Sequence, residues 1–463
     1  MAISIQQQPT SPNMANADLV FAVSSSQINQ PQFQYVVDIY ESGSSTIVQR
    51  VKQQVNPSGY GVFNLGEILT QNMPTSTGLG YERAIDNIES IWSSDRVFLG
   101  NVDNAKQYDI KFGEEYGTSA SSSVTLYDGA GSAGEPVVSA SLFYYLNDGH
   151  VDINDEVNFN FNSSSKYQEE NPLDDVTFTH QFGLTDMPAT QSIRLGDAHT
   201  ISLFNGNLSS GPNSSSAQDI FSMTVTQYDV TGSLLSTTNL YNLTCRTSQV
   251  YFWNQNGTYL RQGGQTRLVH ATTGPLQLEE YGTPIATSCS YYEVEFNAQA
   301  TDGLINENGV WGRYRFNVTE ANCGYNGVRF IWKNKYGVWD YYNFSLAEST
   351  NGIIERKSYN QSFVDYSSTT STVSFDKARR GKNNYYNKVT KRRGAQTDYL
   401  TQAEADVIKE LFYSTNVYIQ DGTDFIPVTI ETANLVEKTN PRTQKLYQYQ
   451  VEYVYANDTR ARN

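Results

Sequence analysis

The chain has 463 residues, too many for one ordinary domain, so about three domains are expected. Its 33 Tyr, 33 Gly and 21 Phe, with only 17% charged residues, are typical of β-rich proteins and unlike helical enzymes, which carry more Ala, Leu, Glu and Lys. The formal net charge of −16 favours solubility and argues against a general nucleic-acid binder.

The start of the chain is polar and has neither the basic nor the apolar region of a signal peptide. No window approaches the roughly 20 apolar residues of a membrane span. We therefore expect synthesis in a cytoplasm and no membrane span. Residues 1–17, with Pro9 and Pro12, are expected to form an extended N-terminal arm that lies on a neighbouring subunit or is disordered when free.

Residues 18–165 are predicted to form a first domain. Large apolar residues alternate with other residues over 33–40 and 108–117, and residues 46–55 resume a strand. Residues 61–73 read as a strand followed by a short helical turn. Short strands at spacings of about 8–12 residues predict an immunoglobulin-like β-sandwich.

A second β-sandwich is predicted over residues 166–322. Its strongest alternating segments are residues 193–206, 219–229, 290–300 and 312–321. The fold class expected for the chain is therefore mostly β, with tandem immunoglobulin-like sandwiches.

The densest group of large rings lies at residues 328–344, VRFIWKNKYGVWDYYNF. Alternation of Phe330 with Trp332, and of Trp339 with Tyr341, predicts two strands joined by a polar turn at 334–337. We interpret this hairpin as the core ribbon of a C-terminal module, residues 323–463, in which strands are also expected near 417–431 and 446–457.

One helix is predicted over residues 402–413. Thr401 and Glu404 have the spacing of a capping box, in which each side chain bonds the other residue's free backbone N–H. An apolar stripe follows at helical spacing, formed by Val407, Ile408, Leu411 and Phe412. The C-terminal module is therefore expected to be α+β.

The sequence offers little support for catalytic or metal-binding residues. Cys245, Cys289 and Cys323 lack metal or disulfide spacing and are expected to be free thiols. His150, His180, His199 and His270 are expected to be structural. The run DGHVDINDE, residues 148–156, does not fit a calcium loop and is read as a hairpin turn, while Glu114 and Glu115 should point to opposite faces of a strand as surface charges. With no catalytic motif present, we expect no enzymatic activity, metal or cofactor.

A basic run occupies residues 377–393, KARRGKNNYYNKVTKRR, which contains eight Lys and Arg and no acid. Subtracting +8 from −16 leaves −24 for the rest of the chain. We predict a basic loop, with three alternatives open: a solvated loop, a loop paired with an acidic neighbouring subunit, or a nucleic-acid contact helped by Tyr385 and Tyr386. The candidate contact residues are Lys377, Arg379, Arg380, Lys382, Lys388, Lys391, Arg392 and Arg393.

Several segments together resemble large structural proteins of tailed bacteriophages, as in phages of Bacteroidetes-type hosts. They are VQRVKQQVNPSGYGVFNLGEIL (48–69), FGEEY (112–116), LTDMP (184–188), IRLGDAHTISLFNG (193–206), RFIWKNKYGVWDYYNF (329–344), LTQAEADVIKELFYSTNVYIQDGTDFIPVTI (400–430) and KLYQYQVEYVYAND (445–458). The C-terminal order of sheet, helix and closing strand also resembles the tail-tube-type β-sandwich module of phage tail proteins. The resemblance transfers no functional residues.

This resemblance implies a virion structural protein, made in the bacterial host cytoplasm and assembled in the tail, baseplate or neck. Its expected partners are other virion proteins and further copies of itself in a ring or trimer, with nucleic acid not expected. A virion protein that binds a host-surface glycan is the first alternative, because Tyr- and Asn-rich loops on sandwiches commonly bind glycans. A virion-associated polysaccharide-cleaving enzyme is the second, and it would need two carboxylates about 5–10 Å apart.

Overall fold

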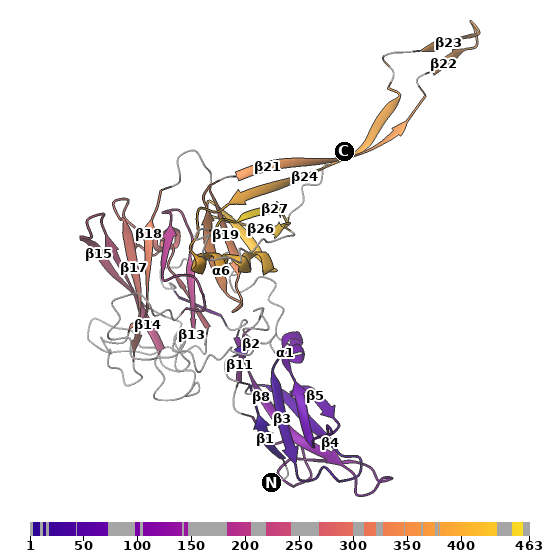
Figure 1. Ribbon diagram of the computed structural model, residues 1–463, viewed down its shortest axis with the longest axis vertical. Coiled ribbons are helices and arrows are strands. Elements are labelled where there is room, and N and C mark those ends of the chain that lie inside the picture. Colours follow the sequence, from indigo (N-terminus) through magenta and orange to yellow (C-terminus); the bar gives the residue numbers. More distant parts are fainter. Residues whose placement is uncertain are drawn as a thin grey trace. The chain divides into compact units, whose positions relative to one another are not determined.

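The computed structural model describes residues 3–9, 13–14, 18–42, 44–72, 98–101, 105–140, 143–146, 183–204, 219–241, 268–299, 310–320, 327–346, 348–362, 364–375, 378, 380–432 and 447–456 (Figure 1). These residues are mostly β, as the composition predicts. The chain divides into two compact units, residues 1–320 with 332–341, and residues 321–331 with 342–463. None of the helices in the described ranges is long and apolar enough to cross a membrane.

The first part of the first unit contains two sheets that share one core. One sheet has the order β1-β3-β6, and the main path of the other is β2-β11-β8-β4-β5, with β9 and β10 also paired to β8. The strands are β1 (Ile3–Gln7), β2 (Asn13–Met14), β3 (Val20–Ser25), β4 (Gln34–Glu41), β5 (Ile47–Gln53), β6 (Tyr60–Asn64), β8 (Ala105–Tyr116), β9 (Thr125–Tyr127), β10 (Val138–Ser139) and β11 (Phe143–Leu146). The predicted helical turn is α1 (Gly66–Asn72).

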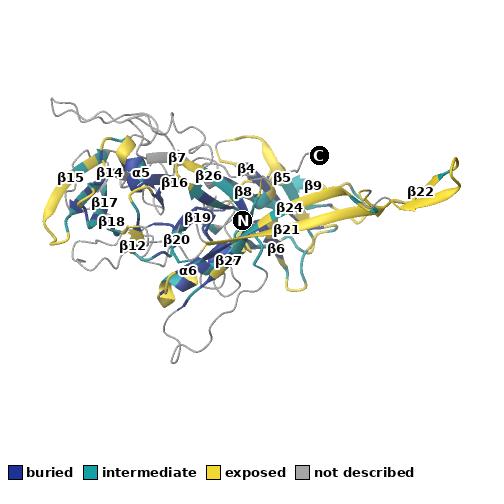
Figure 2. Ribbon diagram, turned by 90° about the horizontal axis from the view of Figure 1, so that it is seen from above, coloured by how far each residue is buried: buried dark blue, intermediate teal, exposed yellow. Residues whose placement is uncertain are grey.

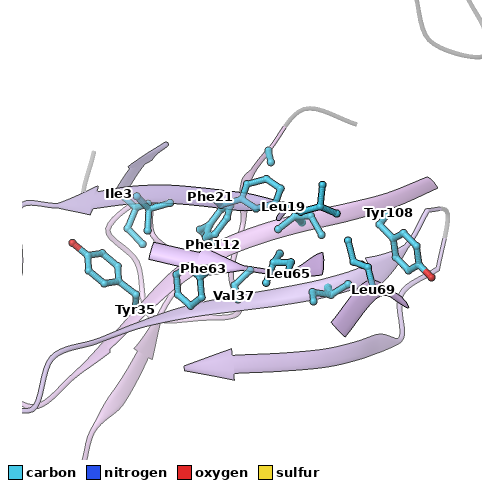
Figure 3. Packing of buried hydrophobic residues seen from close by; sticks show 14 of the residues in the cluster. Ile3, Leu19, Phe21, Tyr35, Val37, Phe63, Leu65, Leu69, Tyr108 and Phe112 are labelled. Carbon is cyan, nitrogen blue, oxygen red and sulfur yellow. The ribbon is translucent and has the colours of Figure 1, made fainter. Parts of the chain in front are cut away.

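Strand alternation places the core side chains of these two sheets against each other (Figure 3). Tyr35 and Val37 of β4 and Phe112 of β8 are fully buried, and they pack with Phe21 and Phe63 from the facing sheet. The ring of Phe112 is 5.7 Å from that of Phe21 and 5.9 Å from that of Phe63, measured between centroids. The predicted inward positions of β4 and β8 are therefore confirmed.

The N-terminal segment is part of this fold, so the prediction of a free or neighbour-bound arm is wrong for its described residues. Strand β1 pairs with β3, and Ile3 is 1% exposed within the core. The backbone N–H of Ile3 also donates to the carbonyl oxygen of Gly129 at 3.0 Å. Within β1 the polar Ser4 and Gln6 lie on the exposed face of a paired strand.

The second part of the first unit also has two sheets with a common core, ordered β12-β18-β17-β14-β15 and β13-β16-β7. Their strands are β7 (Phe98–Asn101), β12 (Thr190–Ile193), β13 (Thr200–Phe204), β14 (Asp219–Tyr228), β15 (Leu234–Tyr241), β16 (Leu268–Thr272), β17 (Tyr291–Gln299) and β18 (Val310–Val318). Strand β7, which the sequence placed in the first domain, pairs with β16 here. The short helix α5 (Pro275–Glu280) was not predicted, although Pro275 occupies a favourable first helical position.

The second unit is built on a seven-stranded sheet of order β20-β19-β25-β26-β27-β24-β21. Its elements are β19 (Val328–Lys333), β20 (Trp339–Phe344), β21 (Glu348–Asn360), β24 (Lys382–Gln396), α6 (Gln402–Tyr413), β25 (Val417–Asp421), β26 (Asp424–Ile430) and β27 (Gln450–Tyr455). A separate two-stranded sheet joins β22 (Val364–Ser367) and β23 (Thr372–Phe375).

Helix α6 has the predicted bounds and the predicted cap. Glu404 N donates to Thr401 Oγ1 at 3.3 Å, and Thr401 N donates to Glu404 Oε2 at 2.8 Å. The apolar stripe is buried except for Phe412, which is partly exposed and whose ring centroid lies 5.9 Å from that of Tyr449. The helix prediction is therefore confirmed at both its cap and its packing face.

The aromatic hairpin 328–344 is confirmed, but its two ends belong to different units. Its turn is closed by Asn334, whose side-chain oxygen accepts from Tyr336 N at 3.0 Å and Val338 N at 3.2 Å. Tyr336 and Val338 lie in the core cluster of the first part of the first unit. The interpretation of the whole hairpin as core of the C-terminal module holds only for its open end, where Phe330 packs on Phe344.

Candidate assembly interface

Strands β21 and β24 form a long two-stranded ribbon, called the ribbon below. Residues 348–360 pair antiparallel with residues 382–395, whereas β27 pairs only with Arg393–Gln396 of β24. At about 3.3 Å per residue, the part of β24 before Arg393 extends about 36 Å past this contact. Figure 1 shows the ribbon leaving the sheet of its own unit, with β22 and β23 at the far end.

The ribbon replaces the loop that the sequence predicted at 377–393. Lys377 and Arg379 lie outside the described residues, whereas Lys382 to Arg393 are in β24. The β-forming residues Tyr385, Tyr386, Val389 and Thr390 explain the strand. The loop prediction is therefore wrong for residues 382–393, because the many cations obscured the β propensity between them.

Nearly the whole ribbon is exposed to solvent. Every residue of β21 is exposed, and so are most residues of β24 before Thr390 (Figure 2). In the described part of the chain, β21 is the last strand of its sheet, so its outer backbone edge pairs with no other strand. A long strand edge of this kind is a ready template for pairing with another chain.

Each face of the ribbon mixes apolar and charged side chains. On one face Ile354 is paired across the strands with Val389, and both are exposed, at 49% and 38%. On the opposite face Glu355 is paired with Lys388, and the Lys357 ammonium lies 5.2 Å from the centroid of Tyr386. Interfaces combine an apolar centre with a polar rim, so this surface is compatible with contact to another chain.

The base of the ribbon is fixed to the sheet by two of the predicted contact residues. Arg392 forms ion pairs with Glu431 and, at 3.5 Å, with Glu452. The Arg393 guanidinium carbon lies 4.0 Å from the ring centroid of Tyr455. Both arginines therefore have an internal anchoring role at the base of the ribbon, and their contact with a neighbouring subunit stays a prediction.

Four other predicted contact residues lie within the described part of the chain. Arg380, Lys382, Lys388 and Lys391 are all exposed. The ribbon segment 348–396 has ten basic and four acidic residues, a net charge of 10 − 4 = +6, so the rest of the chain carries −16 − 6 = −22. Residues 348–396 are thus net positive, whereas the rest of the chain is net negative.

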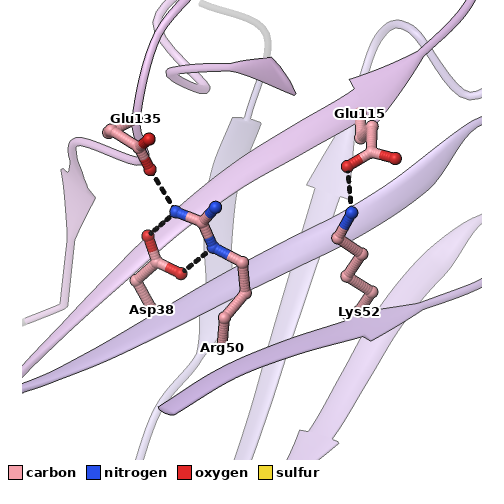
Figure 4. A network of polar contacts seen from close by, with 5 residues as sticks. All are labelled: Asp38, Arg50, Lys52, Glu115 and Glu135. Atoms are coloured by element: carbon pink, nitrogen blue, oxygen red, sulfur yellow. Dashed lines mark hydrogen bonds and ion pairs between the residues drawn. The ribbon is translucent and has the colours of Figure 1, made fainter. Parts of the chain in front are cut away.

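Adjacent carboxylates at Glu114 and Glu115 point to opposite faces of β8, as predicted, but their environments differ. Glu115 pairs with Lys52 on the polar face, beside the Asp38–Arg50–Glu135 network (Figure 4). Glu114 is fully buried and accepts a hydrogen bond from Ser25 Oγ at 2.5 Å. Burial raises the pKa of Glu114, so its assignment as a surface charge is wrong.

The two described histidines are buried and hydrogen-bonded. His199 Nδ1 lies 2.7 Å from Thr273 Oγ1, and His270 Nδ1 lies 2.7 Å from Ser202 Oγ. Burial and the Lys333 cation lower the pKa of His270 to about 4. These histidines have structural partners, and within the described ranges no group of three His, Cys, Asp or Glu is placed to hold a metal ion.

Of the remaining candidate cysteines and histidines, only Cys289 lies within the described residues. Cys289 is a buried free thiol, as predicted, and burial raises its pKa. His150, His180, Cys245, Cys323 and the 148–156 run lie outside the described residues. The ribbon is therefore the best candidate for a functional surface among the described elements.

No family model matches the sequence, and no curated protein matches it. The exposed ribbon and its charge are the features of the described residues that best indicate a function.

Proposed function

We propose that this chain is a structural protein of a tailed-bacteriophage virion. In this proposal it assembles through contacts between β domains in the tail, baseplate or neck, and acts as a building block without enzymatic activity. The paired sheets of the first unit are proposed to be immunoglobulin-like sandwiches. The sheet and helix of the second unit are proposed to be a tail-tube-like module.

The observation that carries the proposal is the exposed ribbon. Ordering a long two-stranded ribbon costs conformational entropy, and a ribbon in water recovers little of that cost by burial. The exposed Ile353, Ile354 and Val389 add apolar surface that a solitary soluble protein gains nothing by presenting. Contact with another subunit supplies the missing burial.

Charge supports the same function. Residues 348–396, at +6, and the rest of the chain, at −22, have opposite net charge, so an acidic subunit surface is a suitable partner for the ribbon. The net negative charge of the whole molecule weighs against DNA as the main partner. A ribbon between subunits also suits a ring or tube, in which each copy contacts the next.

Removing the ribbon tests this function. Asn351 and Arg392 are directly opposite each other, so residues 352–391 can be replaced by Asn-Gly, which closes a two-residue hairpin. This shortened chain keeps the anchors Arg392 and Arg393. It should fold and melt like the full chain but be missing from purified particles; normal incorporation of the shortened chain would contradict the proposal.

Glycan recognition is the alternative that one observation favours. The rings of Tyr359 and Tyr385 lie 6.3 Å apart, and the two side chains are 49% and 57% exposed. Exposed aromatic faces can stack on sugar rings. Binding of the purified chain to host surface polysaccharide, lost in a Tyr359→Ala/Tyr385→Ala variant, would support this alternative.

A further inference from the structure

The hairpin formed by β22 and β23, called the tip hairpin below, has one wholly apolar face. Val364 is paired with Phe375, and Tyr366 with Val373, so these four side chains share a face. The other face carries the polar pairs formed by Asp365 with Ser374 and Ser367 with Thr372. This strict alternation is the pattern of a strand pair that has one side covered.

The apolar face is nevertheless exposed. The exposed fractions are 38% for Val364, 64% for Tyr366, 56% for Val373 and 66% for Phe375. A single two-stranded hairpin is only marginally stable in water. The sequence pattern and the exposure together indicate a surface that is covered when the protein is in its working state.

We propose that the tip hairpin docks, by its apolar face, on the body of a second copy of this chain, while the basic ribbon lies along the acidic surface of that copy. The inference rests on the proposed function and names the partner of its interface. Residues 348–396 carry +6 and the rest of the chain −22, so each copy has both halves of a complementary contact.

The length of the ribbon makes this contact compatible with the acidic charge of both bodies. Its reach of about 36 Å exceeds several Debye lengths, which are about 8 Å each at physiological salt. At a separation of about 36 Å, salt screens the repulsion between the acidic parts of two copies. The ribbon of one copy still reaches the other copy at this separation. The attraction is local, between the cations of the ribbon and the surface beneath them.

The distribution of cations favours a protein surface over a lipid bilayer. Arg380 and Lys382 lie close in sequence to the tip hairpin, and Lys388 and Lys391 continue the basic charge along β24. A membrane-inserted tip needs cations only at the depth of the lipid headgroups, so it does not account for Lys388 and Lys391. A ribbon with cations along its length instead matches an extended acidic surface.

The geometry of such a contact is heterologous, because the ribbon of one copy meets a different surface on the next. Repetition of a heterologous contact produces a ring when the rotation closes and a filament when it does not. Assembly should therefore continue past a dimer as concentration rises. It should also weaken with added salt, since the ribbon contact is ionic.

The test is sedimentation velocity of the full chain over a range of protein and salt concentrations. The variant Tyr366→Ser/Val373→Ser alters the apolar face, and the matched control Ser367→Thr/Thr372→Ser exchanges two residues on the polar face of the same hairpin. We expect the wild type and the control to associate alike, and the apolar-face variant to associate about 30-fold more weakly, as loss of an interface anchor does. All three chains should show the same melting temperature, because the tip hairpin lies outside both core clusters.

Three results would overturn the inference. They are a wild type that stays monomeric at every concentration, equal association of the apolar-face variant, and binding of wild type but not of this variant to vesicles of phosphatidylcholine and phosphatidylserine. Particle composition separates the two proposals. A chain that is monomeric but present in purified particles refutes only the docking between copies. A chain that self-associates but is absent from particles refutes the virion function.

Discussion

The guanidinium carbon of Arg393 lies 4.0 Å from the ring centroid of Tyr455, which joins neighbouring strands β24 and β27. The same guanidinium is 3.9 Å from the carboxylate of Glu348 at the start of β21. One side chain thus connects both strands of the ribbon to the sheet. Its partial burial, at 25% exposure, strengthens the contact with the ring relative to a fully solvated cation.

Arg393→Ala should loosen the base of the ribbon. Loss of the ring contact and the ion pair should lower the free energy of unfolding of the second unit by about 1–2 kcal/mol. Urea denaturation and amide hydrogen exchange in β24 measure the effect. Lys391→Ala, on the same face two residues away, is the control and should change the free energy by less than about 0.5 kcal/mol; equal effects of the two substitutions would refute an anchoring role.

Thr401→Ala should destabilise helix α6. The substitution removes the side-chain acceptor for Glu404 N and one half of the capping box, at a cost of about 1 kcal/mol. Faster amide exchange in the first turn of α6 measures the loss. Thr423→Ala, at an exposed position in the turn between β25 and β26, is the control. Unchanged exchange in α6 would show that packing alone holds the helix end.

His270 should make the first unit less stable in acid. Its pKa is near 4 in the folded state against an ordinary value of 6.5, so the unfolded chain binds the proton more tightly. The stabilisation is complete above pH 6.5 and declines as the pH falls toward 4, by about 3 kcal/mol for this difference in pKa.

The variant His270→Gln isolates this contribution, because glutamine does not titrate. Denaturation of wild type and variant should show that the wild type loses more stability between pH 7.5 and pH 4. The extra loss comes from the difference between the folded and unfolded pKa of His270. Parallel curves for the two proteins would show that His270 has the same pKa in both states.

Gly61→Ala should disturb the core of the first unit. A Cβ at this position would lie 2.6 Å from Cδ2 of the buried Tyr35 ring, which cannot move without displacing its neighbours. Overpacking of this kind costs about 1–3 kcal/mol. Gly196→Ala is the matched control, since a Cβ there meets nothing within 4 Å. A thermal melt compares the two, and similar melting temperatures would contradict the steric argument.

Local patterns in the sequence were sufficient for several elements. The capping box at Thr401 fixed the start of α6, and alternation of Tyr35, Val37 and Ile39 identified the core face of β4. Both signals are contained within a few residues, because one turn of helix or one strand face determines them. The mostly β class follows from the same alternation.

Pairing between distant segments could not be predicted in this way. Strand β7 joins β16 across more than 160 residues of sequence, and nothing in its own residues specifies that partner. The burial of Glu114 cannot be predicted locally either, because its hydrogen-bond partner Ser25 is 89 positions away. The ribbon, in contrast, has a local strand pattern in β24. The many cations in that segment favoured a loop prediction instead.

The division of hairpin 328–344 between the two units affects how the chain folds during synthesis. Tyr336 and Val338 complete a core whose other members all precede residue 185. Asp340 likewise accepts the hydrogen bond of Thr185 Oγ1, at 2.6 Å. The N-terminal unit therefore cannot finish folding until about residue 341 has left the ribosome, and a fragment that ends at residue 322 would expose an incomplete core and an unsatisfied Thr185.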